Sequence, residues 1–413
     1  MARARGRLDA VVLLGLLGVA CRMAAEDPGP VPNPGAAAAP DASALVVETY
    51  NVGLAHGFVN HSADRVAPLI AALEASTADL ICLQEVWTPE DRHAFHAALK
   101  SAFPYSWHTP VEQSSASSPA CGVGDLFGRD RFVSCLQGTC GDLEGDQQTD
   151  CVVEECGHTL ERLKEAKPSC ANALMAQVGS SAPAALWAVL RPWGTASLYA
   201  YGGSDGLLLL SKRPLTDPGV VDLSAVSTLN RRRALTATVS VSGQDVAVGC
   251  THLAADLTDT APYPGPFSSW AEENRAQVEL LLELDRKLRG PRVWLGDFNC
   301  SFADMAMEVV GEFEESCGQF TAIGLEDVAS TAAGGCTFCA ENTLADTSRS
   351  TRIDHVFVRD LKADEVSRVT DRMWAYQPMD GEPVYLPLSD HYGVRARLSI
   401  SDSQALPFGV SDG

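Results

Sequence analysis

Five short polar patterns lie in order along this chain of 413 residues, and each carries groups suited to binding a metal ion or a phosphate. Most of them follow apolar, β-branched runs of the kind that form buried strands. Runs that each stop at a carboxylate, an amide or an imidazole predict a sheet whose strand ends converge on one polar site. The patterns are Tyr50-Asn51, Leu83-Gln84-Glu85, Thr251-His252-Leu253, Gly296-Asp297-Phe298-Asn299 and Ser389-Asp390-His391.

Hydrolysis of a phosphoester is the chemistry that these residues would serve. The reaction needs the charge on the phosphoryl oxygens to be neutralised and a water to be aligned opposite the leaving group. Glu85 and Asn51 supply oxygen ligands of the hard kind that Mg²⁺ prefers. Asp297 and Asn299 stand at i and i+2 of one strand end and therefore share a face, where they could orient a water or share a metal ion.

Two histidines and a further carboxylate add proton chemistry to the set. His252 and His391 are each suited to bind a phosphoryl oxygen or to exchange a proton near neutral pH. The further carboxylate is Asp354, in Arg352-Ile353-Asp354, and its role is what the family resemblance described below implies: it would accept a hydrogen bond from His391, fixing the tautomer of the imidazole and raising its basicity. Either Asp297 or His391 could then be the group that takes a proton from water.

The segments between the patterns predict the elements that hold them. Helices are expected from Ser62 to Ala75, from the Thr88-Pro89 capping sequence to about Ala102, and from Ser269 to Gly290. Strands both alternate with helices and follow one another as hairpins, which favours an α/β sandwich with mixed sheets over a purely parallel fold. The expected strands cover residues 44–47, 79–82, 206–211, 234–241, 246–250, 293–296, 352–358 and 394–400.

A segment from about Ser114 to Gly203 interrupts this rhythm and holds six of the 13 cysteines. Their number and spacing predict a surface insert closed by three disulfides, and a zinc site is the alternative. Two further pairs are suggested by proximity, Cys300 with Cys317 and Cys336 with Cys339. Cys82 and Cys250 lie inside expected core strands and are interpreted as buried free thiols, with a disulfide between them as the alternative. The six clustered cysteines are Cys121, Cys135, Cys140, Cys151, Cys156 and Cys170.

The N-terminus has the composition of an export signal. Three arginines precede an apolar segment from Ala10 to Ala20, and Cys21 follows small residues as in a lipobox. Cys21 would be lipidated in a bacterial cell-envelope lipoprotein, whereas cleavage alone would give a soluble secreted protein. A segment rich in Pro and Ala then forms a semi-extended tether. Export agrees with the disulfides, which form in oxidising compartments.

The formal net charge of −22 bears on the substrate. Proteins that clamp long nucleic acids normally present a basic surface that replaces condensed counterions, so this charge argues against a nuclease. The run Arg231-Arg232-Arg233 is the one dense basic sequence after the N-terminal segment. It is interpreted as a solvated hairpin from which Arg233, just before an expected strand, could reach a substrate phosphate.

Taken together, the motifs resemble those of the endonuclease/exonuclease/phosphatase (DNase-I-like) superfamily in order and approximate spacing. The resemblance implies a four-layer α/β sandwich, with two mixed central sheets flanked by helices and the cysteine-rich insert added. It also implies a metal-dependent phosphoesterase in which Glu85 is the principal ligand and Asp390 a further one. Expected divisions are 1–21 (signal or lipobox segment), 22–43 (linker), 44–401 (catalytic domain, with the insert at 114–203) and 402–413 (tail).

Within that superfamily the chain is most similar to neutral sphingomyelinases. The similarity rests on Glu85-Val86-Trp87 followed by Asp91, on the segment 206–214, and on Leu388-Ser389-Asp390-His391-Tyr392. It implies an exported phosphodiesterase of sphingomyelinase or phospholipase C type that uses Mg²⁺ or another divalent cation such as Mn²⁺. A lipid headgroup at a membrane surface is the expected substrate, and a monomer is expected.

Three other functions remain open from the sequence: an extracellular endonuclease, a phosphomonoesterase acting on inositol phosphates, and a sandwich that binds a lipid or a partner without turnover. The site assignment is common to the three enzymatic hypotheses. Catalytic roles are assigned to His252, Asp297, Asn299, Asp354 and His391; substrate binding to Asn51, His252, Asn299 and Arg233; and metal binding to Asn51, Glu85, Asp297, Asn299 and Asp390.

Overall fold

The computed structural model describes residues 43–56, 58–112, 119–143, 145–177, 181–192, 197–258, 263–331, 335–378 and 382–401. The expected signal segment and C-terminal tail lie outside these residues, as does all of the expected linker except Ser43. Among the described residues, none of the helices is both long and apolar enough to cross a membrane.

Two six-stranded mixed sheets form the centre of the fold. The first has the order β11-β14-β1-β2-β4-β3 and the second the order β5-β6-β7-β8-β10-β9. Strands of the first are β1 (Ala44–Asn51), β2 (Leu80–Gln84), β3 (Tyr105–Trp107), β4 (Leu208–Ser211), β11 (Leu361–Val369) and β14 (Gly393–Ile400). Strands of the second are β5 (Thr216–Asp222), β6 (Arg233–Val241), β7 (Gln244–His252), β8 (Arg292–Asp297), β9 (Glu326–Asp327) and β10 (Asp354–Arg359).

Each sheet contains one parallel pair at its centre, β1 with β2 and β7 with β8. A helix connects the two strands of each pair, as parallel neighbours require. These helices are α1 (Ser62–Glu74) and α8 (Trp270–Asp285). Parallel strands end at the same edge of their sheet, so the polar residues that terminate them are brought together.

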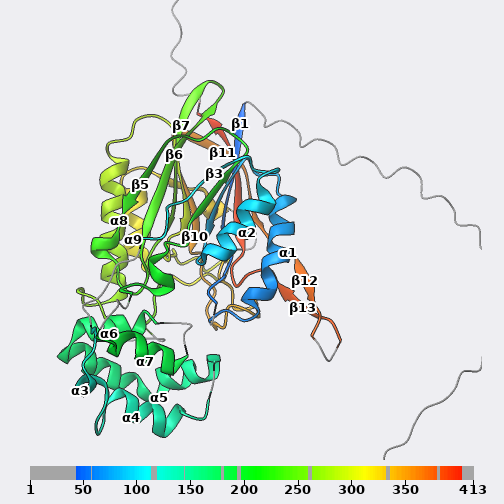
Figure 1. Cartoon of the computed structure of the whole chain (residues 1–413). Helices are drawn as coiled ribbons and strands as arrows, with labels where there is room; N and C mark the ends of the chain where they lie inside the picture. Colours follow the sequence, from blue (N-terminus) through cyan, green and yellow to red (C-terminus); the bar gives the residue numbers. More distant parts are fainter. Residues whose placement is uncertain are drawn as a thin grey trace, which may run out of the picture. The chain divides into compact units, whose positions relative to one another are not determined.

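Helices cover the outer face of each sheet (Figure 1). Helices α1 and α2 (Pro89–Leu99) bury Leu69, Leu73 and Phe95 against the first sheet, and α8 and α9 (Glu314–Ala322) pack against the second. The hydroxyl of Thr88 accepts a hydrogen bond from the Asp91 N–H at 3.0 Å, which caps α2 as the sequence predicts. The expected four-layer α/β sandwich is confirmed.

A disulfide between Cys82 and Cys250 crosses the apolar core between the sheets. The interpretation of these cysteines as free thiols is therefore wrong. Cys82 lies on β2 of one sheet and Cys250 on β7 of the other, and both are fully buried. Periodicity places each side chain on the inner face of its own sheet, but it does not tell which residues of the opposite sheet face it.

The cysteine-rich insert folds as a cluster of helices with an apolar core of its own. Three disulfides close it, Cys121–Cys170, Cys135–Cys156 and Cys140–Cys151, so the disulfide interpretation is confirmed and the zinc alternative is wrong. The pairs Cys300–Cys317 and Cys336–Cys339 are also confirmed. The helices are α3 (Val123–Leu126), α4 (Phe132–Cys135) with a helical turn at Leu136–Cys140, α5 (Gly145–Ala166), α6 (Pro168–Met175) and α7 (Ala182–Leu190).

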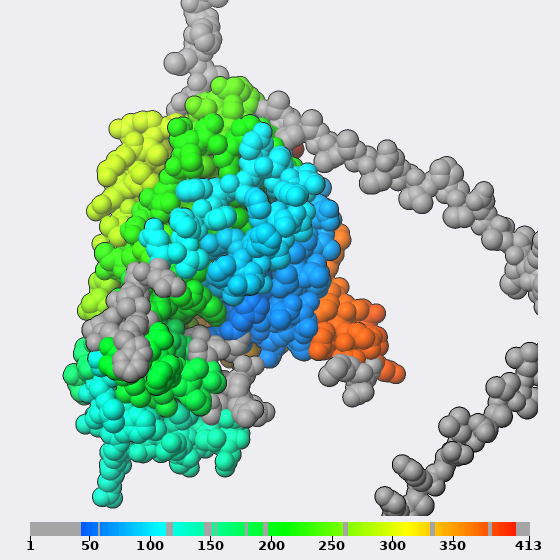
Figure 2. All heavy atoms as spheres, in the orientation of Figure 1, coloured from blue at the N-terminus to red at the C-terminus, as the bar shows by residue number. Residues whose placement is uncertain are grey.

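A separate two-stranded hairpin projects beside α1, formed by β12 (Met373–Tyr376) and β13 (Val384–Pro387). Figure 2 shows its orange atoms standing out from the blue residues that follow the N-terminal strand. The Trp374 indole donates to the Pro387 carbonyl at 3.1 Å and joins the two strands. Because β13 ends at Pro387, the hairpin leads directly into the Ser389-Asp390-His391 pattern.

Candidate active site

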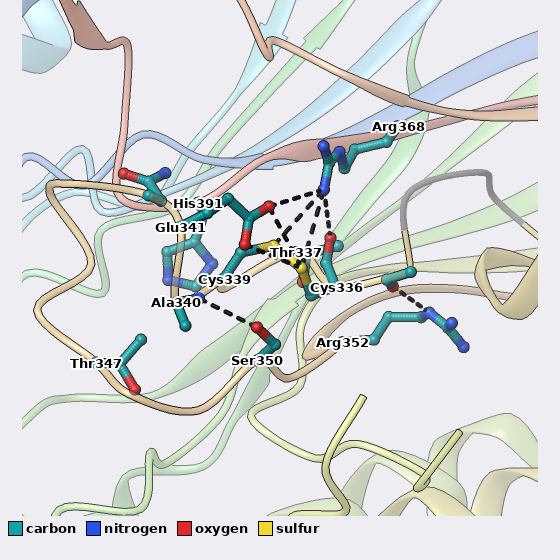
Figure 3. The surroundings of a disulfide bond; sticks show 12 residues. Cys336, Thr337, Cys339, Ala340, Glu341, Thr347, Ser350, Arg352, Arg368 and His391 are labelled. Carbon is teal, nitrogen blue, oxygen red and sulfur yellow. Dashed lines mark hydrogen bonds and ion pairs between the residues drawn. A yellow bond between two sulfur atoms is a disulfide. The ribbon is translucent and has the colours of Figure 1, made fainter. Parts of the chain in front are cut away.

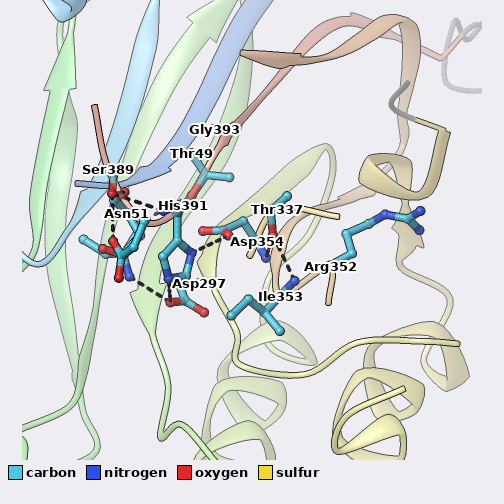
Figure 4. Close-up of polar contacts among 12 residues, drawn as sticks. Thr49, Asn51, Asp297, Thr337, Arg352, Ile353, Asp354, Ser389, His391 and Gly393 are labelled. Carbon is cyan, nitrogen blue, oxygen red and sulfur yellow. Dashed lines mark hydrogen bonds and ion pairs between the residues drawn. The ribbon is translucent and has the colours of Figure 1, made fainter. Parts of the chain in front are cut away.

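The strand ends of both sheets meet at one polar cluster (Figure 4). In the parallel pairs, Asn51 lies opposite Gln84, the residue before Glu85, and His252 lies opposite Asp297. Asp297 is also the register partner of Asp354 on the antiparallel strand β10. The fold therefore gathers residues that are more than 200 positions apart in the sequence.

Asn51 links the carboxylates that come from different sheets. Its Nδ2 donates to Asp297 Oδ2 at 2.9 Å and to Glu85 Oε1 at 3.3 Å. Its Oδ1 accepts from the Gly53 N–H at 3.0 Å. In this arrangement the amide acts on the carboxylates as a donor and its oxygen is turned toward the backbone of the following loop.

Glu85 and Asp390 form a pair of acidic groups suited to a hard cation. Glu85 Oε2 is buried and has no hydrogen-bond partner among the described residues. Burial, together with the nearby charge of Asp390, raises the pKa of Glu85. An orphaned carboxylate oxygen beside a second carboxylate fits the oxygen ligands that a divalent ion such as Mg²⁺ takes. The donor set therefore fits a metal held by Glu85 and Asp390.

Backbone packing holds the Asp390 carboxylate in place. Gly53 has a φ of +56°, and a Cβ there would lie 2.0 Å from Asp390 Oδ1, so only glycine permits this approach. The buried Arg65 donates from Nη1 to the carbonyls of Val52 at 2.9 Å and Leu388 at 2.7 Å. One side chain of α1 thus ties the loop after β1 to the segment that carries Asp390.

Asp354 and His391 make the pair expected from the sequence. Nδ1 of His391 lies 2.9 Å from Asp354 Oδ2, and its Nε2 lies 4.0 Å from Asp297 Oδ2. Burial lowers the pKa of His391, but the charges of Asp354, Asp390 and Asp297 outweigh it and raise that pKa to about 10. The imidazole is therefore oriented by one carboxylate with its other nitrogen turned toward the centre of the cluster.

The short loop closed by the Cys336–Cys339 disulfide contacts the backbone around this pair (Figure 3). Thr337, between Cys336 and Cys339, accepts from the N–H of Asp354 at 3.2 Å through its hydroxyl, and its carbonyl accepts from the Tyr392 N–H at 2.8 Å. Arg368 holds the loop from outside by donating to the Cys336 carbonyl at 3.4 Å. The sequence suggested this disulfide from the spacing of its cysteines but gave no sign that the loop supports the site.

Asp297 stands at the centre of the cluster. Its Oδ2 lies 3.4 Å from His252 Nε2, and its Oδ1 accepts from the Asn299 N–H at 3.0 Å. Burial and the charge of Asp354 raise the pKa of Asp297 to about 7. Burial and the charge of Arg232 lower the pKa of His252 well below its ordinary value, so this imidazole is neutral.

Asn299 has a left-handed backbone, with a φ of +48°, a conformation that asparagine tolerates better than most residues. Its Nδ2 donates to the Leu253 carbonyl at 3.0 Å, which ties the loop after β8 to the residue after His252.

Arg232, the neighbour of the residue singled out in the sequence, is the arginine of the 231–233 run whose charge interacts with Glu85 and Asp297. Arg233 donates to Glu112 Oε2 at 2.6 Å and lies 3.8 Å from Asp205, away from the metal candidates. Arg232 is 4 % exposed, its Nη1 has no partner among the described residues, and Asp297 and Glu85 act on its charge. Its guanidinium lies 5.8 Å from the centre of the Trp87 ring. Burial of an unpaired guanidinium is costly unless a ligand completes it.

Comparisons with known proteins agree with this geometry. The sequence model of the Endonuclease/Exonuclease/phosphatase family matches residues 49–391. A search of curated proteins finds no significant match to the sequence.

Two solved structures show the same fold at low sequence identity. A sphingomyelinase C from Streptomyces griseocarneus has a TM-score of 0.50 and 17 % identity, over 86 % of this chain and 99 % of that one. A double-mutant beta toxin from Staphylococcus aureus, solved with bound magnesium ions, has a TM-score of 0.50 and 12 % identity, over 87 % of this chain and 100 % of that one.

Proposed function

The chain belongs to the Endonuclease/Exonuclease/phosphatase family, whose members hydrolyse phosphoesters. From this premise we propose that it is an exported phosphodiesterase of sphingomyelinase or phospholipase C type that depends on a divalent metal ion. The observation that carries the proposal is the convergence of Glu85, Asp390, Asp297 and two histidines on one cluster. The fold shared with a sphingomyelinase C supports it.

Glu85 and Asp390 are the residues that would hold the metal ion, Mg²⁺ or a similar divalent cation such as Mn²⁺. When bound, such an ion would neutralise charge on a phosphoryl oxygen and lower the pKa of a water. The orphaned Glu85 Oε2 is the feature of the structure that fits this role most directly.

The remaining residues would bind and orient the phosphoryl group. His252 Nε2 and His391 Nε2 both face Asp297 Oδ2, at 3.4 and 4.0 Å, so a phosphoryl oxygen placed among them would have donors on two sides. Arg232 offers an unpaired, buried guanidinium to the same anion. Asp297, with a pKa of about 7, is the group suited to take a proton from the attacking water, and His391, whose raised pKa keeps it protonated beside Asp354, would donate a hydrogen bond to the phosphoryl group.

Charge and surface chemistry favour a lipid substrate over nucleic acid. The net charge of −22 repels a polyanion but not a zwitterionic headgroup. The β12–β13 hairpin exposes Met373 at 50 %, Val384 at 48 % and Tyr385 at 67 %, and it is continuous in sequence with the site residues. Apolar side chains gathered on a projecting element suit contact with a membrane surface.

Oxidised cysteines support export. All twelve cysteines among the described residues are disulfide bonded, in six pairs. Such a set persists outside the reducing cytosol.

A parallel assay of three substrates tests the proposal. The protein from about residue 43 onward, with Mg²⁺, is mixed with sphingomyelin vesicles, plasmid DNA and inositol phosphates. We expect release of phosphocholine that is abolished by chelator and falls by orders of magnitude in Glu85→Gln, which keeps the shape of the side chain but removes its charge. The rate of sphingomyelin hydrolysis in the vesicles should depend weakly on salt between roughly 50 and 200 mM. A nuclease would lose affinity for DNA steeply over the same range. DNA cleavage without phosphocholine release would make the nuclease hypothesis correct.

A further inference from the structure

One aromatic residue at the end of the cysteine-rich insert has an unusual backbone. Tyr201 has φ and ψ of 51° and 34°, and Gly202 after it has a φ of 67°. A left-handed conformation is uncommon for an aromatic residue and persists only where the surroundings impose it. Such strain in a segment next to an active site points to a functional constraint on the position of the side chain.

The segment around Tyr201 is docked firmly onto the loop that leads to Arg232. The Ala200 N–H donates to the Leu229 carbonyl at 2.7 Å. The Tyr199 hydroxyl donates to the Ser224 carbonyl at 3.0 Å. These bonds fix the chain on the N-terminal side of Tyr201, and on the other side the Ser204 N–H donates to the carbonyl of Tyr201 itself at 3.3 Å. These hydrogen bonds fix the position of Tyr201 at the end of the insert.

That place is the edge of the candidate active site. The ring of Tyr201 stacks on Trp87, with centroids 4.9 Å apart and planes 11° apart. Trp87 follows Glu85 by two residues, and its ring lies 5.9 Å from that of His252. Burial and the charge of Glu85 raise the pKa of Tyr201.

Tyr201 is more exposed to solvent than Trp87, the residue on which its ring stacks. The residue is partly exposed, whereas Trp87 is 2 % exposed, and no described residue hydrogen-bonds the Tyr201 hydroxyl. Trp87 is fully enclosed by the protein and cannot itself meet a ligand. Tyr201 is thus the partly exposed member of an aromatic pair whose buried member, Trp87, lies beside His252.

We propose that Tyr201 is a specificity-determining residue that packs its ring against the quaternary ammonium group of a choline phosphodiester. This inference rests on the proposed function, because it places the phosphoryl group of the substrate at Glu85 and His252. A trimethylammonium group has no N–H to donate, so an aromatic surface is a better partner for it than a hydrogen-bond acceptor.

The experiment compares choline with ethanolamine headgroups on the same lipid. Sphingomyelin and its phosphoethanolamine analogue are presented in otherwise identical vesicles with Mg²⁺, and kcat/KM is measured for wild type, Tyr201→Phe and Tyr201→Leu. We expect Tyr201→Phe to keep the wild-type choline preference. Tyr201→Leu should lose about tenfold in kcat/KM for the choline lipid and less than about threefold for the ethanolamine lipid. Trp187→Leu is the matched control, because Trp187 is an aromatic residue of the same insert that is 60 % exposed on α7 and has none of the contacts described for Tyr201.

Equal losses in kcat/KM on both lipids, or no loss on either, would leave the choline preference of Tyr201→Leu unchanged. That result would overturn the headgroup assignment while leaving the proposed function intact. Absence of phosphocholine release from wild type would instead overturn the proposed function and, with it, this inference. Inhibition of wild type by phosphocholine and by phosphoethanolamine gives a second measurement that does not depend on any variant. Phosphocholine should inhibit about tenfold more strongly, and equal inhibition would contradict the proposal.

Discussion

Removal of the Cys82–Cys250 disulfide should destabilise the protein more than removal of any shorter bridge. The bond joins residues 168 positions apart. In the chain-entropy relation, a crosslink that closes so long a loop raises the free energy of the unfolded chain by about 5 kcal/mol. The nested Cys121–Cys170 bond shortens the loop, but the relation is logarithmic and the estimate falls by only about 0.3 kcal/mol. Domains are commonly stable by about 5–15 kcal/mol, so the loss is a large share of the total.

Urea denaturation of Cys82→Ala/Cys250→Ala measures this effect. The matched control is Cys140→Ala/Cys151→Ala, which removes a bridge with a separation of 11 and a predicted effect of about 3 kcal/mol. We expect the first double variant to unfold at the lower urea concentration and with a steeper dependence on urea, because its unfolded chain is less constrained. A larger loss in the control would refute the loop-length reasoning.

Three other predictions concern the site and its surroundings. Asp354→Ala/His391→Ala should be little less active than His391→Ala alone, because the two residues act as a unit, and multiplied losses in kcat would contradict this. Arg232→Gln should raise KM for the vesicle substrate or lower kcat at least tenfold, while Arg233→Gln should keep more activity; the reverse order would return the phosphate contact to Arg233. Burial and the charge of Asp256 raise the pKa of Glu312 to about 7, so its contribution to stability is complete below about pH 4.5 and is lost as pH rises through about 7. Glu312→Gln should therefore have the same melting temperature as wild type at pH 4 but be more stable than wild type at pH 8 by roughly 3 kcal/mol. Equal melting temperatures at pH 8 would refute the assignment.

Much of the site could be predicted because it is built from strand ends. Apolar runs that stop at Asn51, Glu85, His252 and Asp297 indicate both the strand and the position at which it leaves the core. In a sandwich with parallel central pairs, these ends have one place to meet. The pairing of Asp354 with His391 was predicted from the resemblance to a known superfamily rather than from periodicity, and the structure places them 2.9 Å apart.

Two features were not predicted from the sequence. One depends on which side of an extended segment a side chain points to, and the other depends on which residues lie opposite each other in the two packed sheets. Arg232 and Arg233 point to opposite sides because side chains alternate along extended chain, and an error of one residue in the start of a strand exchanges them. β6 begins at Arg233, so the choice between the two was beyond the precision of the sequence pattern. The Cys82–Cys250 bond likewise depends on how two sheets face each other, which no local pattern encodes.

The charge of the protein and the charge of the site point to the same kind of substrate. The cluster contains four carboxylates, Glu85, Asp297, Asp354 and Asp390. The buried positive groups that act on them are the guanidinium groups of Arg232 and Arg65 and the His391 imidazole, whose pKa is raised. Such a site repels an anion unless a divalent cation stands between them, and the surface with its charge of −22 repels polyanions at longer range. In the proposed complex, a phosphocholine headgroup would bring one negative charge for the metal ion and one permanent positive charge for the ring of Tyr201. It therefore meets an acidic protein without net repulsion, whereas each added phosphate of a nucleic acid would increase the repulsion.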